Sequence, residues 1–348
     1  MSVRSLWFQQ LVTNPTHHPK PAIPSSSFTR QNPLAKILHL TASPGPPSPG
    51  PDPLRHKAAQ ELHDHLADLS NIPDMPLPLC AIVDFQMGWT KEVFWKFHVP
   101  VIGFFTFGAY AAAMEWGSWK VRAGDIRPDE LRLIPGLPDH MALTISDIKR
   151  RPAGPPRGGA NRPPGGRRGG GPPKPGDRPP WVPEIEGSVA LMFNTCDFLE
   201  RPFIEYMKTQ MGMPVWGVGP LLPETYWKPS DSLLLPERPM KPHHWRQSNY
   251  IEDDVARWLD SKPRGSVLYV AFGSEVGYGV CEDFTEMVKK EDIVEGIERL
   301  MGDEGVKRQA MEIGKRLEDG FPASSVAALA VFVDFIRPKT SSEVYRIV

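Results

Sequence analysis

The chain is poor in cysteine. Cys80, Cys196 and Cys281 are the only three among 348 residues, and they form no CxxC pair. Such sparse cysteines exclude a disulfide-stapled scaffold and a zinc finger, and they are typical of a reducing compartment. Lys plus Arg total 40 and Asp plus Glu total 41, for a net charge of −1. This balance gives no reason to expect a nucleic-acid partner.

Long apolar runs are also missing. No run reaches the ~18 residues that a membrane-spanning helix needs, and residues 1–10 lack the apolar core of a secretory signal. We therefore expect a cytoplasmic protein with no membrane partner. His17–His18 and His243–His244 are the paired histidines, and no cysteine or acidic residue stands at ligand spacing from either pair. No metal site is predicted.

Proline is abundant, at 40 of 348 residues, or about 11%. Residues 1–55 show little periodicity, and we interpret them as an irregular Pro-rich segment. In 152–180, ten prolines and nine glycines fill 19 of 29 positions, which predicts a disordered insertion. Its Arg-Gly-Gly repeats at Arg157 and Arg168 are also typical of RNA-binding tails. The absence of aromatic residues between Arg150 and Pro180 favours a solvated linker.

Strand and helix patterns alternate along the first two thirds of the chain. Apolar runs predict strands over 79–83, 100–105, 188–194 and 214–218. Periodic stretches predict helices over 57–69, 89–97, 109–121 and 197–211. This alternation indicates an α/β fold with a parallel sheet.

The last third is mostly helical. One strong strand pattern, 266–272, is followed by helices over 291–301, 304–317 and 325–336, and a short helix is predicted over 251–259. A single strand does not make a second α/β domain. Either this strand joins the first sheet or the second domain is incomplete.

Asp84 is the first candidate site residue, because it ends an apolar strand and precedes a helix. Ligands of open α/β sheets bind beyond the carboxyl ends of the strands. The alternative is that Asp84 only caps the helix that follows. Gly273 and Ser274 open a glycine-rich stretch after the strand 266–272, where backbone N–H groups could face a phosphate. A plain turn is the alternative there, because no Walker A sequence is present.

Longer strings carry a family resemblance. CAIVDFQMGWTKEVFWKFHVPVIGFFTFGA (80–109), PGLPDHMALTISDIKRR (135–151), FNTCDFLERPFIEYM (193–207), PVWGVGPLLPE (214–224), VARWLDSKPRGSVLYVAFGSE (255–275) and VKKEDIVEGIERLMGDEGVKRQAMEIGKRL (288–317) resemble the plant family 1 UDP-dependent glycosyltransferases. The resemblance implies a GT-B-like fold with two Rossmann-type domains. It implies a small hydroxylated acceptor on the first domain and a UDP-sugar on the second, as co-substrate and with no further cofactor.

The resemblance also assigns roles to residues. In members of the family, a histidine near the N-terminus takes the proton of the acceptor hydroxyl, and an aspartate orients this histidine. Asp84 matches that aspartate, and Gly273 and Ser274 match the turn that contacts the diphosphate. Two departures stand against activity. Residues 1–24 show no first strand with its Gly-His loop, so His17 and His18 receive no role. The Trp-Cys-Pro-Gln and His-Cys-Gly-Trp-Asn-Ser strings of the donor site are also absent.

The sequence therefore predicts a truncated family member. The expected parts are an irregular segment (1–55), an acceptor-type domain (56–228), a linker (229–250) and a remnant of the donor domain (251–348). The function implied by the resemblance is transfer of a sugar from a UDP-sugar to a small-molecule hydroxyl by a monomer. A non-catalytic product and a small-molecule binding module are the alternatives.

Overall fold

The computed structural model describes residues 6–12, 36–42, 53–73, 77–145, 147, 176–222, 227, 252–263, 266–267 and 290–337. Contacts divide the chain into two units. The first comprises residues 1–148, 163–219 and 324–348, and the second comprises 149–162 and 220–323. Each unit is described by itself.

A parallel sheet of four strands organises the first unit. Its strands are β3 (Ala81–Asp84), β4 (Val101–Phe105), β5 (Ala190–Phe193) and β6 (Val215–Gly217), and they lie in that order. All three strand pairs are parallel, and Asp84 lies opposite Phe104. The predicted α/β class and its parallel sheet are confirmed.

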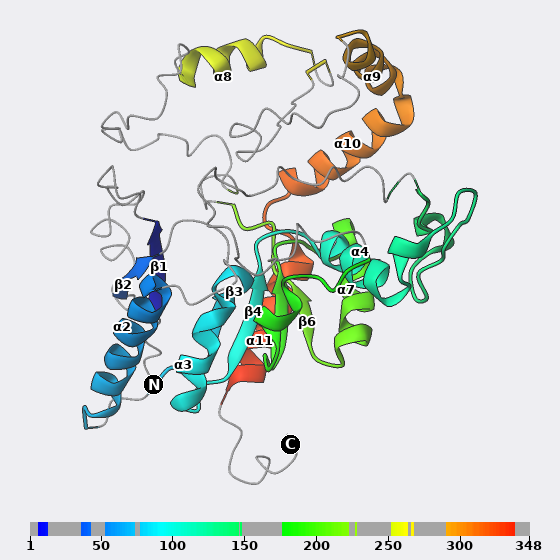
Figure 1. The fold of residues 1–348 in the computed structure, drawn as a ribbon. Helices are drawn as coiled ribbons and strands as arrows, with labels where there is room; N and C mark the ends of the chain where they lie inside the picture. Colours follow the sequence, from blue (N-terminus) through cyan, green and yellow to red (C-terminus); the bar gives the residue numbers. More distant parts are fainter. Residues whose placement is uncertain are drawn as a thin grey trace, which may run out of the picture. The chain divides into compact units, whose positions relative to one another are not determined.

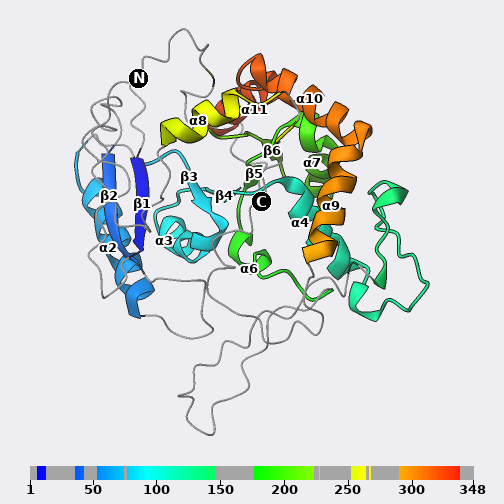
Figure 2. The same cartoon turned by 90° about the horizontal axis from the view of Figure 1, so that it is seen from above.

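Side chains that alternate along the strands bury both faces of the sheet. In β5, Ala190 and Met192 pack toward α11 (Ala323–Ile336), whose Phe332 lies in the same apolar cluster. Leu191 and Phe193 pack on the other face. That face is covered by α4 (Ala109–Lys120) and α7 (Asp197–Met211), which lie side by side (Figure 2).

A second cluster covers the β3 end of that face. It joins α2 (Pro53–Ser70) and α3 (Lys91–Lys96) to Ala81, Val83 and Val101. In α2, Ala58, Leu62 and Leu66 repeat every four residues and are almost fully buried, which is why this stretch forms an amphipathic helix. Figure 1 shows α3 and α11 on opposite sides of the strands.

Short elements connect these layers. A 3-10 helix, η1 (Phe85–Thr90), joins β3 to α3, and η2 (Ala123–Asp125) and η3 (Asp139–Met141) follow α4. The one-turn helix α6 (Val182–Ile185) packs on η1. Gly88 allows this approach, because a Cβ at that position would collide with Glu184.

Two predictions for Pro-rich sequence need correction. Residues 1–55 are not wholly irregular, since β1 (Leu6–Val12) and β2 (Lys36–Ala42) form a parallel two-stranded sheet. The expectation that residues 1–24 hold no strand is wrong for the same reason. Both strands mix apolar with polar residues, as in the central Gln9 and Gln10 of β1, so neither shows a clear strand pattern. The insertion ends earlier than predicted: Pro179 is buried, and a Cβ on Gly176 would lie 2.5 Å from the Gly124 nitrogen. Residues 152–175 lie outside the described residues.

The described secondary structure of the second unit consists mainly of α-helices. It contains α8 (Glu252–Asp260), α9 (Lys290–Gly302) and α10 (Glu304–Glu318). The predicted strand 266–272 lies outside the described residues except for Ser266 and Val267, which are not in a strand. The predicted boundaries also differ from the contacts, because residues from Ser324 onward group with the first unit.

No single helix in the described ranges is long and apolar enough to cross a membrane. Only α10 and α11 taken together reach that length and apolar composition, and the pair is bent where the two helices join.

Candidate functional site

Asp84 stands where the sequence predicted it, as the last residue of β3. Its Oδ1 accepts a hydrogen bond from the Gln86 N–H at 2.9 Å, so it caps the 3-10 helix η1. Capping was the alternative interpretation of this residue, and the geometry shows that it holds. The capping bond uses one carboxylate oxygen of Asp84. Among the described residues, no histidine is recorded in contact with the other oxygen. His17 and His18 lie outside the described residues.

The environment of Asp84 makes its carboxyl group a weaker acid than a free aspartate. Partial burial raises the pKa of the carboxyl group, and the hydrogen bond from the Gln86 backbone opposes this in part. A carboxyl group with a raised pKa at the carboxyl end of a strand is a candidate functional group.

Aromatic side chains gather at the same ends of the strands. Phe85 stacks on Phe105 with ring centroids 5.2 Å apart, and Phe107 meets both rings edge-on at 5.4 and 5.3 Å. Phe105 is fully buried, whereas Phe85 and Phe107 are half-buried. The half-buried rings are suited to contact with an apolar or aromatic molecule.

The loop after β4 is held by two side chains from the segment after β5. Asn194 Nδ2 donates to the Thr106 carbonyl at 3.2 Å. The Tyr110 N–H, in the first turn of α4, donates to Glu200 Oε2 at 3.2 Å. Both side chains thereby fix the backbone of residues 106–110 next to the strand that pairs with β3.

The sequence interpretation missed Asn194 and Glu200. Asn194 directly follows β5, so the rule that singled out Asp84 applied to it equally. Glu200 had a weaker signal in Pro202, which interrupts the hydrogen bonding of α7. No local pattern reveals that the Glu200 side chain contacts a helix that begins 91 positions earlier, at Ala109.

The other predicted site residues are not described. Gly273 and Ser274 lie outside the described residues, as do both histidine pairs. Among the residues that are described, no group of three or more His, Cys, Asp or Glu side chains is placed to hold a metal ion.

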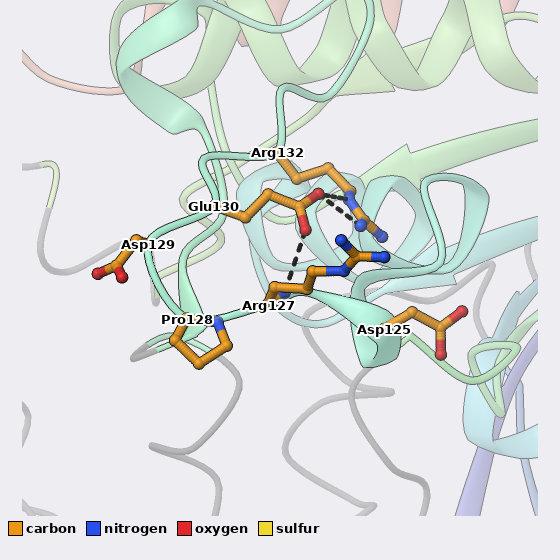
Figure 3. A pocket seen from close by; sticks show the side chains of 6 residues that line it. All are labelled: Asp125, Arg127, Pro128, Asp129, Glu130 and Arg132. Carbon is orange, nitrogen blue, oxygen red and sulfur yellow. Dashed lines mark hydrogen bonds and ion pairs between the residues drawn. The ribbon is translucent and has the colours of Figure 1, made fainter.

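An open pocket of about 580 Å³ lies away from Asp84, in the loop that follows α4 and η2. Figure 3 shows its lining side chains: Asp125, Arg127, Pro128, Asp129, Glu130 and Arg132. Glu130 is the centre of this group. Its Oε1 accepts from Arg132 Nη2 at 2.5 Å, and its Oε2 accepts from the Arg127 N–H at 3.1 Å.

These charges have a structural role. The Arg127 N–H and then the Arg132 guanidinium hold the pKa of Glu130 below its usual value. Arg132 Nη1 also donates to the carbonyls of Val121 and Arg122, at 3.0 and 2.8 Å. Arg132 therefore satisfies carbonyl groups at the C-terminal end of α4. For this reason we place the candidate site at Asp84 and not at this pocket.

Known proteins that are similar in sequence to this chain include plant UDP-glycosyltransferases, the family that the sequence strings resemble. No family model matches the chain. The chain is 41% identical over 233 residues to mogroside I-E synthase of Siraitia grosvenorii, covering 66% of this chain and 45% of that protein. It is 27% identical over 225 residues to UDP-glycosyltransferase 73E1 of Stevia rebaudiana, covering 62% of this chain and 38% of that protein.

A solved structure of Phytolacca americana UGT2, complexed with UDP-2fluoro-glucose and pterostilbene, is 18% identical and covers 77% of this chain and 52% of that chain, with a TM-score of 0.45. By sequence, the chain is related to the plant UDP-glycosyltransferases. It spans less than half the length of the curated relatives named above.

Proposed function

We propose that the first unit binds a small hydroxylated molecule at the carboxyl ends of β3, β4 and β5, as the acceptor-binding part of a UDP-glycosyltransferase. The observation that carries this proposal is the position of Asp84, a half-buried carboxyl group with a raised pKa at the end of β3. The half-buried rings of Phe85 and Phe107 supply apolar surface near it. The relatedness to plant UDP-glycosyltransferases supports the same class of ligand.

We further propose that this chain alone does not transfer sugar above background. A hydroxyl group becomes a good nucleophile when a base takes its proton, which typically contributes about 10²- to 10⁴-fold in rate. The family resemblance gives Asp84 the orienting part of such a pair and gives no histidine the base part. The donor-site strings that would bind the UDP-sugar are also absent from the sequence. Positioning of two reactants can supply about 7 to 11 kcal/mol of barrier lowering.

Calorimetry on the purified chain tests the binding proposal with a panel of flavonoid and terpenoid alcohols. We expect saturable binding of at least one of them and a loss of about fivefold or more in affinity for Asp84→Ala. The matched control is Asp125→Asn, which changes an exposed carboxylate in the loop pocket and should leave affinity unchanged. Absence of saturable binding across the panel would contradict an acceptor site.

Incubation with UDP-glucose and the same panel tests the second proposal. UDP release and glucoside formation should remain at the level of the protein-free control. Turnover that Asp84→Ala abolishes would show instead that the chain is a working transferase. Micromolar affinity for UDP would show that a donor site is present despite the missing strings.

A further inference from the structure

Glu200 departs from the helix in which it lies. Within α7 it has φ −140° and ψ 26°, values outside the helical region, and Pro202 follows two residues later. The N–H groups of Leu199 and Glu200 both donate to the Cys196 carbonyl, at 3.1 and 3.0 Å. The first turn of α7 is therefore offset from the rest of the helix at Glu200.

The carboxylate of Glu200 lies on the first turn of α4. It accepts the Tyr110 N–H at 3.2 Å, and a Cβ added to Gly108 would collide with both of its oxygens. Gly108 has φ −75° and ψ 161°, an ordinary conformation for any residue. The glycine is needed there for space and not for backbone freedom. The Glu200 carboxylate also places negative charge at a helix N-terminus, where it is favourable.

The side chain of Tyr110 is fixed but open to solvent. Its ring packs edge-on against Phe203 with centroids 4.9 Å apart, yet the residue is 44% exposed. In the part of the chain that the structure describes, no hydrogen bond of the Tyr110 hydroxyl is recorded. An aromatic side chain held in place with one side exposed can contact a ligand at little loss of conformational entropy.

We propose that Glu200 is a positioning residue of the acceptor site: it fixes the loop 106–110 so that Tyr110 contacts the bound molecule. The inference rests on the proposed function, because the loop follows β4 directly and β4 pairs with the strand that ends at Asp84. Asn194 holds the same loop at Thr106.

The experiment compares Glu200→Ala, Glu200→Gln and Tyr110→Ala with a matched control, Glu205→Ala. Glu205 lies on the same helix and is exposed. Its carboxylate forms an ion pair with Lys208 on that helix, with 3.7 Å between Glu205 Oε2 and Lys208 Nζ. Hydrogen exchange of the Tyr110 amide reports the state of the loop. Calorimetry with kaempferol and the best ligand of the panel reports binding.

We expect Glu200→Ala to speed exchange at Tyr110 about fivefold, as for the loss of one helix cap, and to weaken binding about tenfold. Glu200→Gln should restore most of both, since its amide oxygen can accept the same N–H group. Tyr110→Ala should weaken binding with Glu200 intact, and Glu205→Ala should change neither quantity. The Glu200→Gln variant separates positioning from a general loss of stability. It should restore slow exchange and tight binding only if Glu200 acts by accepting the Tyr110 N–H.

Faster exchange without weaker binding would overturn the inference, because the loop would then not border the ligand. Unchanged exchange in Glu200→Ala would overturn it as well. If the unmodified chain binds no ligand of the panel, the proposed function is wrong, and the exchange rates alone then decide whether Glu200 holds the loop.

Discussion

Ser325 donates its hydroxyl hydrogen to the carbonyl of Gly219 at 2.6 Å, across 106 positions of sequence. Both residues are buried, and Ser325 is fully so. Beside it, the Asp197 N–H donates to Ser324 Oγ at 3.3 Å, which satisfies an amide at the start of α7. These two hydroxyl groups fasten the start of α11 to the segments that follow β5 and β6.

Replacing Ser325 with alanine should destabilise the first unit by about 1–3 kcal/mol, because the buried Gly219 carbonyl loses its partner. Urea denaturation followed by tryptophan fluorescence measures the change, with Trp216 packed on α11 as a local reporter. Thr209→Ala is the control, since Thr209 is exposed and bonds only within α7. Equal stability of the two variants would mean that the Ser325 bond contributes nothing net.

Asp84→Asn should stabilise the protein near neutral pH. Burial raises the pKa of Asp84 in the folded state, so folding favours its protonated form. The contribution of this group to stability is thus fully present below about pH 4, the usual range of an aspartate, and is lost as pH rises through the folded pKa. Asparagine stays neutral and can still accept the Gln86 N–H.

Urea midpoints at pH 4.5 and 7.5 would measure this difference. We expect the advantage of Asp84→Asn to be larger at pH 7.5 than at pH 4.5. A variant that is less stable than the natural chain at pH 7.5 would show that the cap formed by the charged Asp84 outweighs the desolvation of its carboxylate.

Deletion of 152–175 should leave the melting temperature nearly unchanged. These residues are rich in glycine and proline and carry little apolar surface to bury. Extending the deletion to Pro180 should lower the melting temperature by several degrees, because Gly176 and Pro179 are packed within the first unit. Circular dichroism melts of both variants distinguish the two expectations, and equal melts would contradict the second.

Cys80 should be slow to alkylate. Burial raises the pKa of its thiol to about 11, so at pH 7.5 its thiolate fraction is about two orders of magnitude below that of a free cysteine. In a Cys281→Ser background, iodoacetamide labelling followed by peptide mass spectrometry measures its rate. The rate at Cys80 should rise about tenfold per pH unit from 7.5 to 9.5, and a plateau near pH 8.5 would refute the raised pKa.

Local sequence patterns were sufficient for most helices and strands. Residues 197–211 were predicted as a helix, and α7 has the same bounds. The strands of the sheet were also anticipated within about two residues, because fully buried parallel strands are short apolar runs flanked by turn residues. The position of Asp84 at the end of an apolar run sufficed to place it at the carboxyl edge of the sheet, the edge at which ligands of open α/β sheets generally bind.

Contacts between distant segments could not be predicted in this way. The kink at Glu200 matters because its carboxylate reaches Tyr110 in another helix, and no periodicity carries that pairing. The same holds for Ser325 and Gly219. Because α11 is apolar on most of its surface, its pattern does not show which side of the helix packs. In the structure, Ser325 and Phe332 are buried, whereas Val326 and Val331 remain exposed.

The hydrogen bond between Ser325 and Gly219 brings together the two points at which the chain leaves the first unit and re-enters it. The polypeptide departs after Gly219 and returns at Ser324, and this bond joins the two points directly. Residues 220–323 thus form an insertion between two adjacent points of the first unit. A short glycine-serine bridge in their place would yield a minimal α/β scaffold, and the same junction would accept a foreign domain by insertion.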